Sequence, residues 1–237
     1  MYQFPLVPSV LAATRLAIDD ASNYDNTLQQ VPLLTSSHRQ WVQQLGIDPD
    51  SLALVQQVHG DQVIAVSRPG RQGVGDGMVT TKSGITLAVR TADCAGIFLV
   101  AENSKGIGLL HAGWRGTRQG IIQKAVQYIM HQWQILPHQL WVAVSPALQG
   151  CCYQVTEEFL EHFPAKYFVH RDSTWRFKFE QVLKDELLTA GIPDHQQFLS
   201  PWCTACSLHP AFHSYRRDKT PQRLLNIIRL TDNSEAK

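Results

Sequence analysis

The sequence lacks the features that mark membrane, secreted and nucleic-acid-binding proteins. No apolar run approaches the roughly 20 residues that cross a bilayer, and the N-terminus has no basic segment followed by an apolar one. Lysine and arginine total 21 against 20 aspartates and glutamates, and no five like charges follow one another. A net charge of +1 gives no long-range field for nucleic acid or an anionic membrane. We expect a cytoplasmic protein without nucleic-acid or membrane partners.

Common nucleotide and nucleophile motifs are also missing. Gly73–Gly77 is glycine-rich but matches neither GxGxxG nor a P-loop, and predicts a flexible surface loop; no GxSxG occurs. Five cysteines, with Cys151 and Cys152 adjacent, suit a reducing cytosol better than a disulfide framework. Cys203 and Cys206 form the only CxxC. Without a second CxxC a four-cysteine zinc site is not indicated, which leaves a redox pair, half a zinc site or two buried thiols.

Hydrophobic periodicity predicts strands in the centre of the chain and helices among and after them. Short apolar runs predict strands over Leu52–Val58, Gln62–Val66, Ile85–Arg90, Gly96–Ala101, Gly106–His111, Leu140–Val144 and Leu224–Leu230. Helical spacing and capping residues predict helices over Ser37–Leu45, Thr117–Trp133, Thr156–Phe163 and Phe179–Ala190. Residues 1–32 are weakly patterned, and we expect the tail 231–237 to fray. The irregular order of strands and helices favours an α+β fold with mixed or antiparallel sheets, in a single domain 1–237.

Three short strings each carry a side chain that can bind a metal ion. They are Gln57-Val58-His59-Gly60, Thr91-Ala92-Asp93-Cys94 and His111–Gly116. One cysteine and two histidines suit a borderline cation such as zinc. A structural zinc site has four protein ligands, whereas three leave a position for water or substrate. If the strings converge, they predict a metal-dependent enzyme.

Each string also has an ordinary structural interpretation. His59 can be a hydrogen-bonded residue at a strand end, and Cys94 a small buried hydrophobe. Asp93 can orient a metal ligand or act as a general base, or it can satisfy backbone amides in a turn. Near His111, the amides at the helix start and Arg115 can hold an anion such as phosphate, or Arg115 can form a structural salt bridge.

Two C-terminal clusters are weaker candidates. His209 and His213 stand four residues apart, but Pro210 argues against one helix carrying both. The basic cluster Tyr215–Lys219 is interrupted by Asp218, which favours a solvated, locally paired surface.

At these strings the sequence resembles the YfiH family, also called the multicopper polyphenol oxidoreductase (laccase-like) or peptidoglycan-editing-factor family; the mammalian protein FAMIN carries a similar domain. The resemblance runs from about Leu52 to Ile228. Besides the three strings it rests on Gly150–Val155, Cys203-Thr204 and Ser214–Asp218. Departures from the family pattern are Gly96, Ser145, His213 and Thr220–Arg223; the first two stand where proline and glycine are common, and none is one of the three candidate ligands.

The resemblance implies an α/β/β/α layered fold and a catalytic metal, usually zinc, bound by His59, Cys94 and His111. Copper can occupy such a zinc site, since divalent copper generally binds more tightly. It implies phosphorolysis of adenosine, inosine, guanosine and methylthioadenosine, and deamination of adenosine. We expect Asp93 as the base and Arg115 as the phosphate holder, with a nucleoside and phosphate as the small-molecule partners of a monomer. An older label is copper-dependent polyphenol oxidation, and editing of peptidoglycan precursors is also attached to bacterial members.

Other classes of function fit the sequence less well. The ten histidines include no HxH pair, and one cysteine with two histidines cannot build the several copper centres of a multicopper oxidase. A metal-free cysteine hydrolase, with Cys94 as nucleophile and His111 or His59 as base, would suit peptidoglycan editing. A non-enzymatic binding module is disfavoured because a purely structural metal site would be closed.

Overall fold

Two stacked sheets form the centre of the fold in the computed structural model, which describes residues 2–3, 10–15, 34–219 and 221–231. The first sheet has the order β1 (Tyr2–Gln3), β2 (Val10–Thr14), β15 (Leu224–Leu230), β7 (Thr86–Thr91), β3 (Leu52–Gln56) and β5 (Gly70–Val74). The second has the order β14 (Gln197–Leu199), β10 (Leu140–Val144), β8 (Ala95–Ala101), β9 (Ile107–Ala112), β6 (Gly77–Thr80) and β4 (Val63–Ala65). A smaller sheet contains β11 (Gln154–Val155), β13 (Thr174–Phe177) and β12 (Phe168–Arg171).

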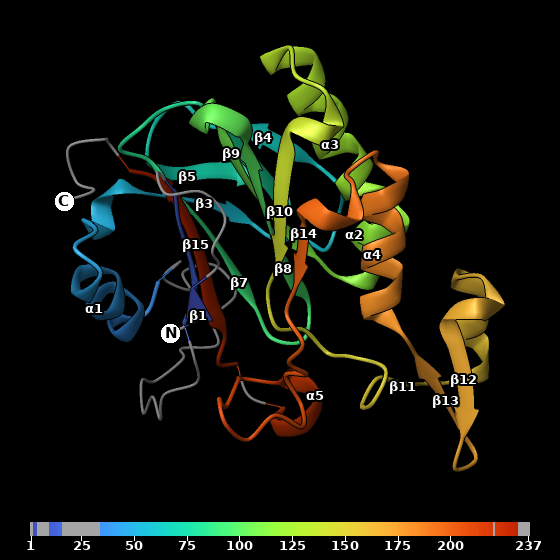
Figure 1. Cartoon of the computed structure of the whole chain (residues 1–237). Helices are drawn as coiled ribbons and strands as arrows, with labels where there is room; N and C mark the ends of the chain where they lie inside the picture. The colour runs from blue at the N-terminus through green and yellow to red at the C-terminus, as the bar shows by residue number, and fades with distance from the viewer. Residues whose placement is uncertain (1, 4–9, 16–33, 220, 232–237) are drawn as a thin grey trace.

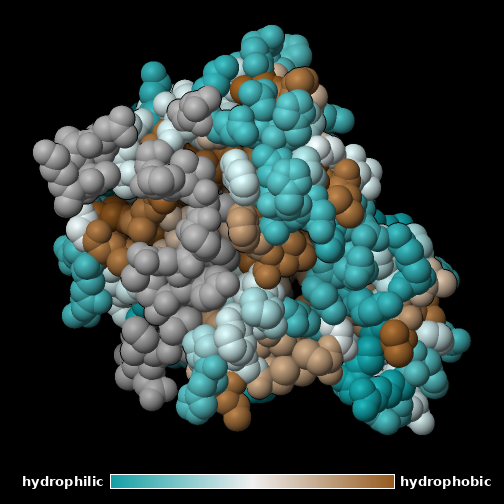
Figure 2. Space-filling view, viewed as in Figure 1, coloured by the Kyte–Doolittle hydropathy of each residue, from teal (hydrophilic) through white to brown (hydrophobic). Residues whose placement is uncertain are grey.

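Helices cover both outer faces of the sheet pair. The α-helices are α1 (Ser36–Gln44), α2 (Trp114–Arg118), α3 (Ile121–Trp133), α4 (Phe179–Thr189) and α5 (Tyr215–Asp218). Short 3₁₀ helices span Pro49–Ser51, Glu102–Ser104, Pro137–Gln139, Glu157–His162, Ala165–Tyr167 and Asp194–Gln196. Figure 1 shows α1 beside the first sheet and α2, α3 and α4 beside the second. Over α4 and the β12–β13 hairpin the surface is mostly hydrophilic, with hydrophobic side chains in separate patches (Figure 2).

Alternation along the strands explains this layering. In β8, Ile97 and Leu99 point into the core shared with α3 and α4, whereas Phe98 and Val100 point into the core between the sheets. On the far side, Trp41 of α1 packs against the outer face of the first sheet. The predicted mixed-sheet α+β fold, in the layer order α/β/β/α, is therefore confirmed. The first sheet mixes antiparallel β7–β15 with parallel β3–β7, and the second mixes antiparallel β8–β9 with parallel β10–β14.

The predicted strands, and the predicted helices over Ser37–Leu45 and Phe179–Ala190, are found within a few residues. Three predictions were wrong. The helix over Thr117–Trp133 is two helices, because Gly120 at φ 86° takes a left-handed conformation between α2 and α3. The helix over Thr156–Phe163 is the 3₁₀ helix Glu157–His162. The loop Gly73–Gly77 instead contains the end of β5 and the start of β6.

Strand β2 lies in the N-terminal segment that has little sequence pattern. Of residues 1–32, the structure describes 2–3 and 10–15. The remainder of that segment and the tail after residue 231 lie outside the described residues. Among the described helices, none has the length and hydrophobicity to span a bilayer.

Two unusual residues of the sequence, Gly96 and Ser145, form one contact. The Gly96 amide donates to the Ser145 hydroxyl at 2.8 Å, a bond that proline at position 96 could not make. A Cβ atom on residue 96 would also lie only 2.9 Å from the buried side chain of Asn226.

Adjacent leucines in α4 provide a matched test of the helix-side core. Leu187 is fully buried, whereas Leu188 is 43% exposed. We expect Leu187→Ala to lower the free energy of unfolding by about 2–5 kcal/mol, because it leaves a cavity, and Leu188→Ala to lower it by less than about 1 kcal/mol. Denaturant unfolding of both variants measures the difference; equal losses would contradict the packing described.

Candidate metal centre

Three connections pass from the first sheet to the second at one end of the sheet pair, and each contributes to a single site. His59 lies between β3 and β4, Asp76 between β5 and β6, and Cys94 between β7 and β8. His111 is near the end of β9, where it pairs with Gly96 at the start of β8. The fold thus brings residues far apart in the sequence to one edge.

The buried carboxylate of Asp76 organises the first part of this site. It accepts hydrogen bonds from the backbone amides of Val58, His59 and Gly60, at 3.1, 3.0 and 2.7 Å. Its Oδ1 also contacts His111 Nδ1 at 2.7 Å, with both side chains almost fully buried. Since Nδ1 is engaged with Asp76, the Nε2 atom of His111 is left for a metal.

Two further features fix the turn that carries His59. Gln57 donates to the Arg90 carbonyl at 2.8 Å and accepts from the Arg90 amide at 2.9 Å, tying the end of β3 to β7. His59 itself has φ 60°, a left-handed backbone conformation that residues other than glycine rarely adopt. The surrounding hydrogen bonds hold this residue in a costly backbone conformation, which places its exposed imidazole beside His111.

Glycines of the string after β9 allow this turn to approach α2. A Cβ atom on Gly113 would lie 2.9 Å from the Cys94 sulfur, and one on Gly116 would lie 2.4 Å from the Gly60 carbonyl oxygen. Side chains larger than hydrogen would force the metal-binding strings apart.

The three predicted ligand residues meet. One potential ligand atom from each of His59, Cys94 and His111 lies within 4.8 Å of the others. The two imidazole rings stand edge to face, with centroids 4.8 Å apart. Zinc–sulfur and zinc–nitrogen bonds of about 2.3 and 2.0–2.1 Å bridge such separations with small adjustments. The donor set and its spacing therefore fit one borderline metal ion, with the exposed side of His59 leaving an opening to solvent.

The charges within the cluster favour a thiolate. Burial alone would raise the pKa of Cys94, but the positive charge and hydrogen bonds of His111 and His59 lower it to about 6. Burial opposes protonation of His111, yet the Cys94 thiolate and Asp76 raise its pKa to about 9. Burial would also raise the pKa of Asp76, and its contacts with His111 and the Gly60 amide bring it below its usual value. A metal would replace the proton on His111 as the partner of the thiolate.

Asp93 joins the site to the C-terminal part of the chain. Its Oδ1 accepts from the hydroxyls of Thr204 and Ser214, both at 2.7 Å. Its Oδ2 accepts from the Arg216 amide at 2.6 Å. These contacts fit the interpretation of Asp93 as a structural carboxylate, and its use as a general base stays a prediction.

Aromatic and basic side chains surround the three ligands. Arg115 is exposed and lies over the Trp114 ring, 4.4 Å from its centroid. Arg216 lies 5.4 Å from the centroid of Tyr153. Burial raises the pKa of Tyr153, and the next largest effects come from the charges of Cys94 and Arg216. Tyr153 is therefore within electrostatic range of Cys94 and Arg115 as well as beside Arg216. Because α2 has only five residues, few peptide dipoles align at its start. The role of Arg115 as phosphate holder stays a prediction.

Sequence reasoning missed Asp76, Tyr153 and Arg216 as members of this site. Tyr153 and Arg216 belong to strings that carry the family resemblance, which was the available signal. Asp76 stands inside the glycine-rich segment that predicts a loop, and nothing in its neighbours signals burial. The other weak candidates, His209 and His213, are not among the groups of metal-binding side chains that the described residues bring together.

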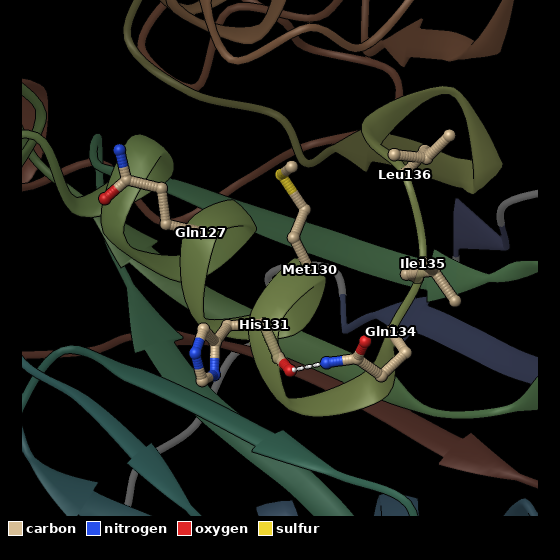
Figure 3. A pocket seen from close by; sticks show the side chains of 6 residues that line it. All are labelled: Gln127, Met130, His131, Gln134, Ile135 and Leu136. Atoms are coloured by element: carbon tan, nitrogen blue, oxygen red, sulfur yellow. Dashed lines mark hydrogen bonds between the residues drawn. The ribbon is translucent and has the colours of Figure 1, made fainter.

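A separate cavity of about 480 Å³ lies at the C-terminal end of α3. Its lining consists of Gln127, Met130, His131, Gln134, Ile135 and Leu136 (Figure 3). The Gln134 side chain there donates to the His131 carbonyl at 2.6 Å. The lining comes from the second half of α3 and the residues that follow it, whereas the string that bears His111 precedes the first residue of this helix. The lining of this cavity has one titratable side chain, His131, so it lacks the set of metal-binding side chains found at His59, Cys94 and His111.

Known proteins share both the sequence and the fold. The family described as multi-copper polyphenol oxidoreductase laccase matches residues 22–231. Purine nucleoside phosphorylase YlmD of Geobacillus stearothermophilus is 30% identical over 215 residues, covering 82% of this chain and 78% of that protein. Purine nucleoside phosphorylase of Aquifex aeolicus is 33% identical over 175 residues, with coverages of 73% and 79%. Adenosine deaminase RL5, from an unknown prokaryotic organism, is 31% identical over 193 residues, with coverages of 73% and 72%.

Solved structures agree with these sequence matches. The crystal structure of YlmD from Geobacillus stearothermophilus superposes with a TM-score of 0.83 at 25% identity, covering 95% of this chain and 94% of that one. A Bacillus licheniformis protein titled YfiH gives a TM-score of 0.80 at 24% identity, covering 94% and 93%. The chain therefore belongs to the YfiH family, described as multi-copper polyphenol oxidoreductase laccase.

Proposed function

We propose that this chain is a zinc-dependent purine nucleoside enzyme. It catalyses phosphorolysis of adenosine, inosine, guanosine and methylthioadenosine to the free base and a ribose 1-phosphate, and hydrolysis of adenosine to inosine and ammonia. The observation that carries the proposal is the convergence of His59, Cys94 and His111, with an open side, in a chain of this family. The names of its relatives, purine nucleoside phosphorylase and adenosine deaminase, support the substrate class.

The donor set supports zinc over a multicopper arrangement. One thiolate and two imidazoles match the ligands of catalytic zinc sites. The described residues bring together one other group of potential ligands, four cysteines, and it contains no histidine. These two groups do not supply the imidazole-rich centres of a multicopper oxidase. Divalent copper still competes for a site of this kind, since it binds most ligand sets more tightly than zinc.

The surrounding side chains suit a nucleoside and phosphate. The half-buried ring of Tyr153 can contact a purine, whereas the Trp114 ring is stacked on His162 and lies under Arg115, so it supports the wall of the site. The guanidinium groups of Arg115 and Arg216 can bind phosphate oxygens with paired hydrogen bonds. A bound zinc ion supplies a Lewis acid and lowers the pKa of water to about 7. Asp76 keeps His111 oriented and holds the His59 turn during turnover.

A metal-free cysteine hydrolase is the second candidate. Although burial opposes it, His111 and His59 lower the pKa of Cys94, and a nucleophilic cysteine needs such a low pKa to be a thiolate. Chelation separates the two proposals. Activity that a chelator abolishes and zinc restores supports the nucleoside enzyme. An activity that survives chelation and is blocked by iodoacetamide supports the hydrolase.

Incubation of zinc-loaded protein with adenosine and phosphate tests the main proposal. We expect adenine and ribose 1-phosphate together with inosine, and loss of all three products in His111→Ala, because that variant lacks a metal ligand. Chromatography of the products is the measurement. Absence of both adenine and inosine, with zinc shown to occupy the site, would overturn the proposed function.

Asp76→Asn tests the support of the metal ligands. We expect zinc affinity to fall about 10–100-fold, because the neutral amide polarises His111 less and its NH₂ cannot accept from the turn amides. Asp61→Asn is the matched control: it is close in sequence but contacts Lys124 near the surface. Competition with a chromogenic chelator gives both values of Kd. Equal affinities in the two variants would contradict the role of Asp76.

Arg115→Gln tests phosphate binding. We expect KM for phosphate to rise about 10–100-fold with a smaller change in kcat, because a charge-assisted contact is worth about 1.5–3 kcal/mol. Arg118→Gln is the control, since Arg118 is also exposed on α2 and contacts His162. Steady-state phosphorolysis at varied phosphate gives the comparison. If the two variants behaved alike, Arg115 would not be the phosphate holder.

A further inference from the structure

Four cysteines from two loops converge outside the candidate metal centre. Cys151 and Cys152 lie between β10 and β11, and Cys203 and Cys206 lie after β14. Their sulfur atoms all lie within 4.8 Å of one another, and all four are free thiols. From the sequence, we expect such a cluster to need a second CxxC. The adjacent pair 151–152 takes its place, and Cys206 is exposed instead of buried.

The spacing of the sulfur atoms suits a tetrahedral ion. With zinc–sulfur bonds of about 2.3 Å, two corners of the tetrahedron lie about 3.8 Å apart. The sulfurs of Cys151 and Cys206 are 3.6 Å apart. That separation is close to the tetrahedral value and much longer than a disulfide bond of about 2.0 Å.

The backbone around Cys203 favours a thiolate. Burial would raise the pKa of Cys203, but hydrogen bonds from the backbone amides of Gln149, Ala205 and Cys206 bring it below the usual value. Amides from both loops therefore point at one sulfur. Amide donors of this kind stabilise the negative charge that a metal-binding sulfur carries.

Burial and mutual proximity oppose ionisation of Cys151 and Cys152. Burial and the neighbouring Cys203 and Cys206 raise the pKa of Cys151. Burial and the same neighbours raise the pKa of Cys152 to about 11. A bound dication removes this repulsion, because thiolates are the form that binds metal.

We propose that Cys151, Cys152, Cys203 and Cys206 bind one zinc ion in a closed, structural four-thiolate site. Four sulfur ligands in tetrahedral arrangement select zinc or an iron–sulfur cluster, and four ligands around one zinc leave no position for substrate. The proposal does not depend on nucleoside chemistry at the His59, Cys94 and His111 site.

The position of this site indicates that the zinc ion would stabilise the contact between two loops. The loops that it joins already meet in a parallel bridge between Ala147 and Cys203, and the Thr204 amide donates to the Ala147 carbonyl at 3.0 Å. Figure 1 shows the chain between β10 and β11 passing close to the segment between β14 and α5. Both loops also contact Asp93, through the Leu148 amide at 2.9 Å and the Thr204 hydroxyl at 2.7 Å. The zinc ion would fasten these loops together next to Cys94.

Metal counting on the whole protein tests the proposal. After expression with zinc and purification under reducing conditions, we expect two zinc ions per chain by mass spectrometry. Cys151→Ser combined with Cys206→Ser should retain one, as should His59→Ala combined with His111→Ala. In the cobalt-substituted protein, sulfur-to-cobalt absorption should fall strongly in the cysteine variant and only slightly in the histidine variant, since the sites hold four sulfurs and one.

A second measurement needs no variant that must fold. Iodoacetamide should label Cys151, Cys152, Cys203 and Cys206 slowly in the zinc-loaded wild type and rapidly after chelation, as read by peptide mapping. One zinc ion per chain that is lost in the histidine variant and kept in the cysteine variant would overturn the proposal. So would iron in place of zinc, or a disulfide among the four cysteines in the zinc-loaded protein.

Discussion

The carboxylate of Asp76 is the interaction on which the candidate metal centre depends. It holds the Val58–Gly60 turn through three backbone amides and His111 through Nδ1, so one buried charge sets the positions of two of the three ligands. Burying such a group is costly unless its oxygens are satisfied, and here four donors surround them. Without this carboxylate, a left-handed His59 and a buried His111 would lack the partner that fixes their orientation.

The architecture explains why these groups meet. Each crossing from the first sheet to the second ends at the same edge, so turns after β3, β5 and β7 stack beside the end of β9. Glycine at positions 113 and 116 lets α2 come within contact distance of those turns. Asp93 then ties the same edge to the C-terminal loops, which bring Tyr153 and Arg216 alongside. The two large sheets position the metal ligands, and the loops supply the residues that surround them.

Much of the fold could be predicted because its strands are short apolar runs with clear ends. The β10 and β15 ranges, Leu140–Val144 and Leu224–Leu230, match the predictions residue for residue. Strand β5 could not be predicted, since Gly70–Val74 is polar, exposed and held by backbone pairing with β3. Asp76 was missed for a related reason: its burial comes from sheet crossings, which local composition does not record. The four-cysteine cluster also depends on two loops about 50 residues apart in the sequence.

Anomalous scattering at the zinc edge, from crystals of protein that is active on adenosine, tests the central claim most directly. We expect a zinc ion about 2.3 Å from the Cys94 sulfur and about 2.0–2.1 Å from the nearest nitrogens of His59 and His111, with its fourth position held by a group from outside the chain. An active protein with no anomalous scatterer among these three side chains would contradict it.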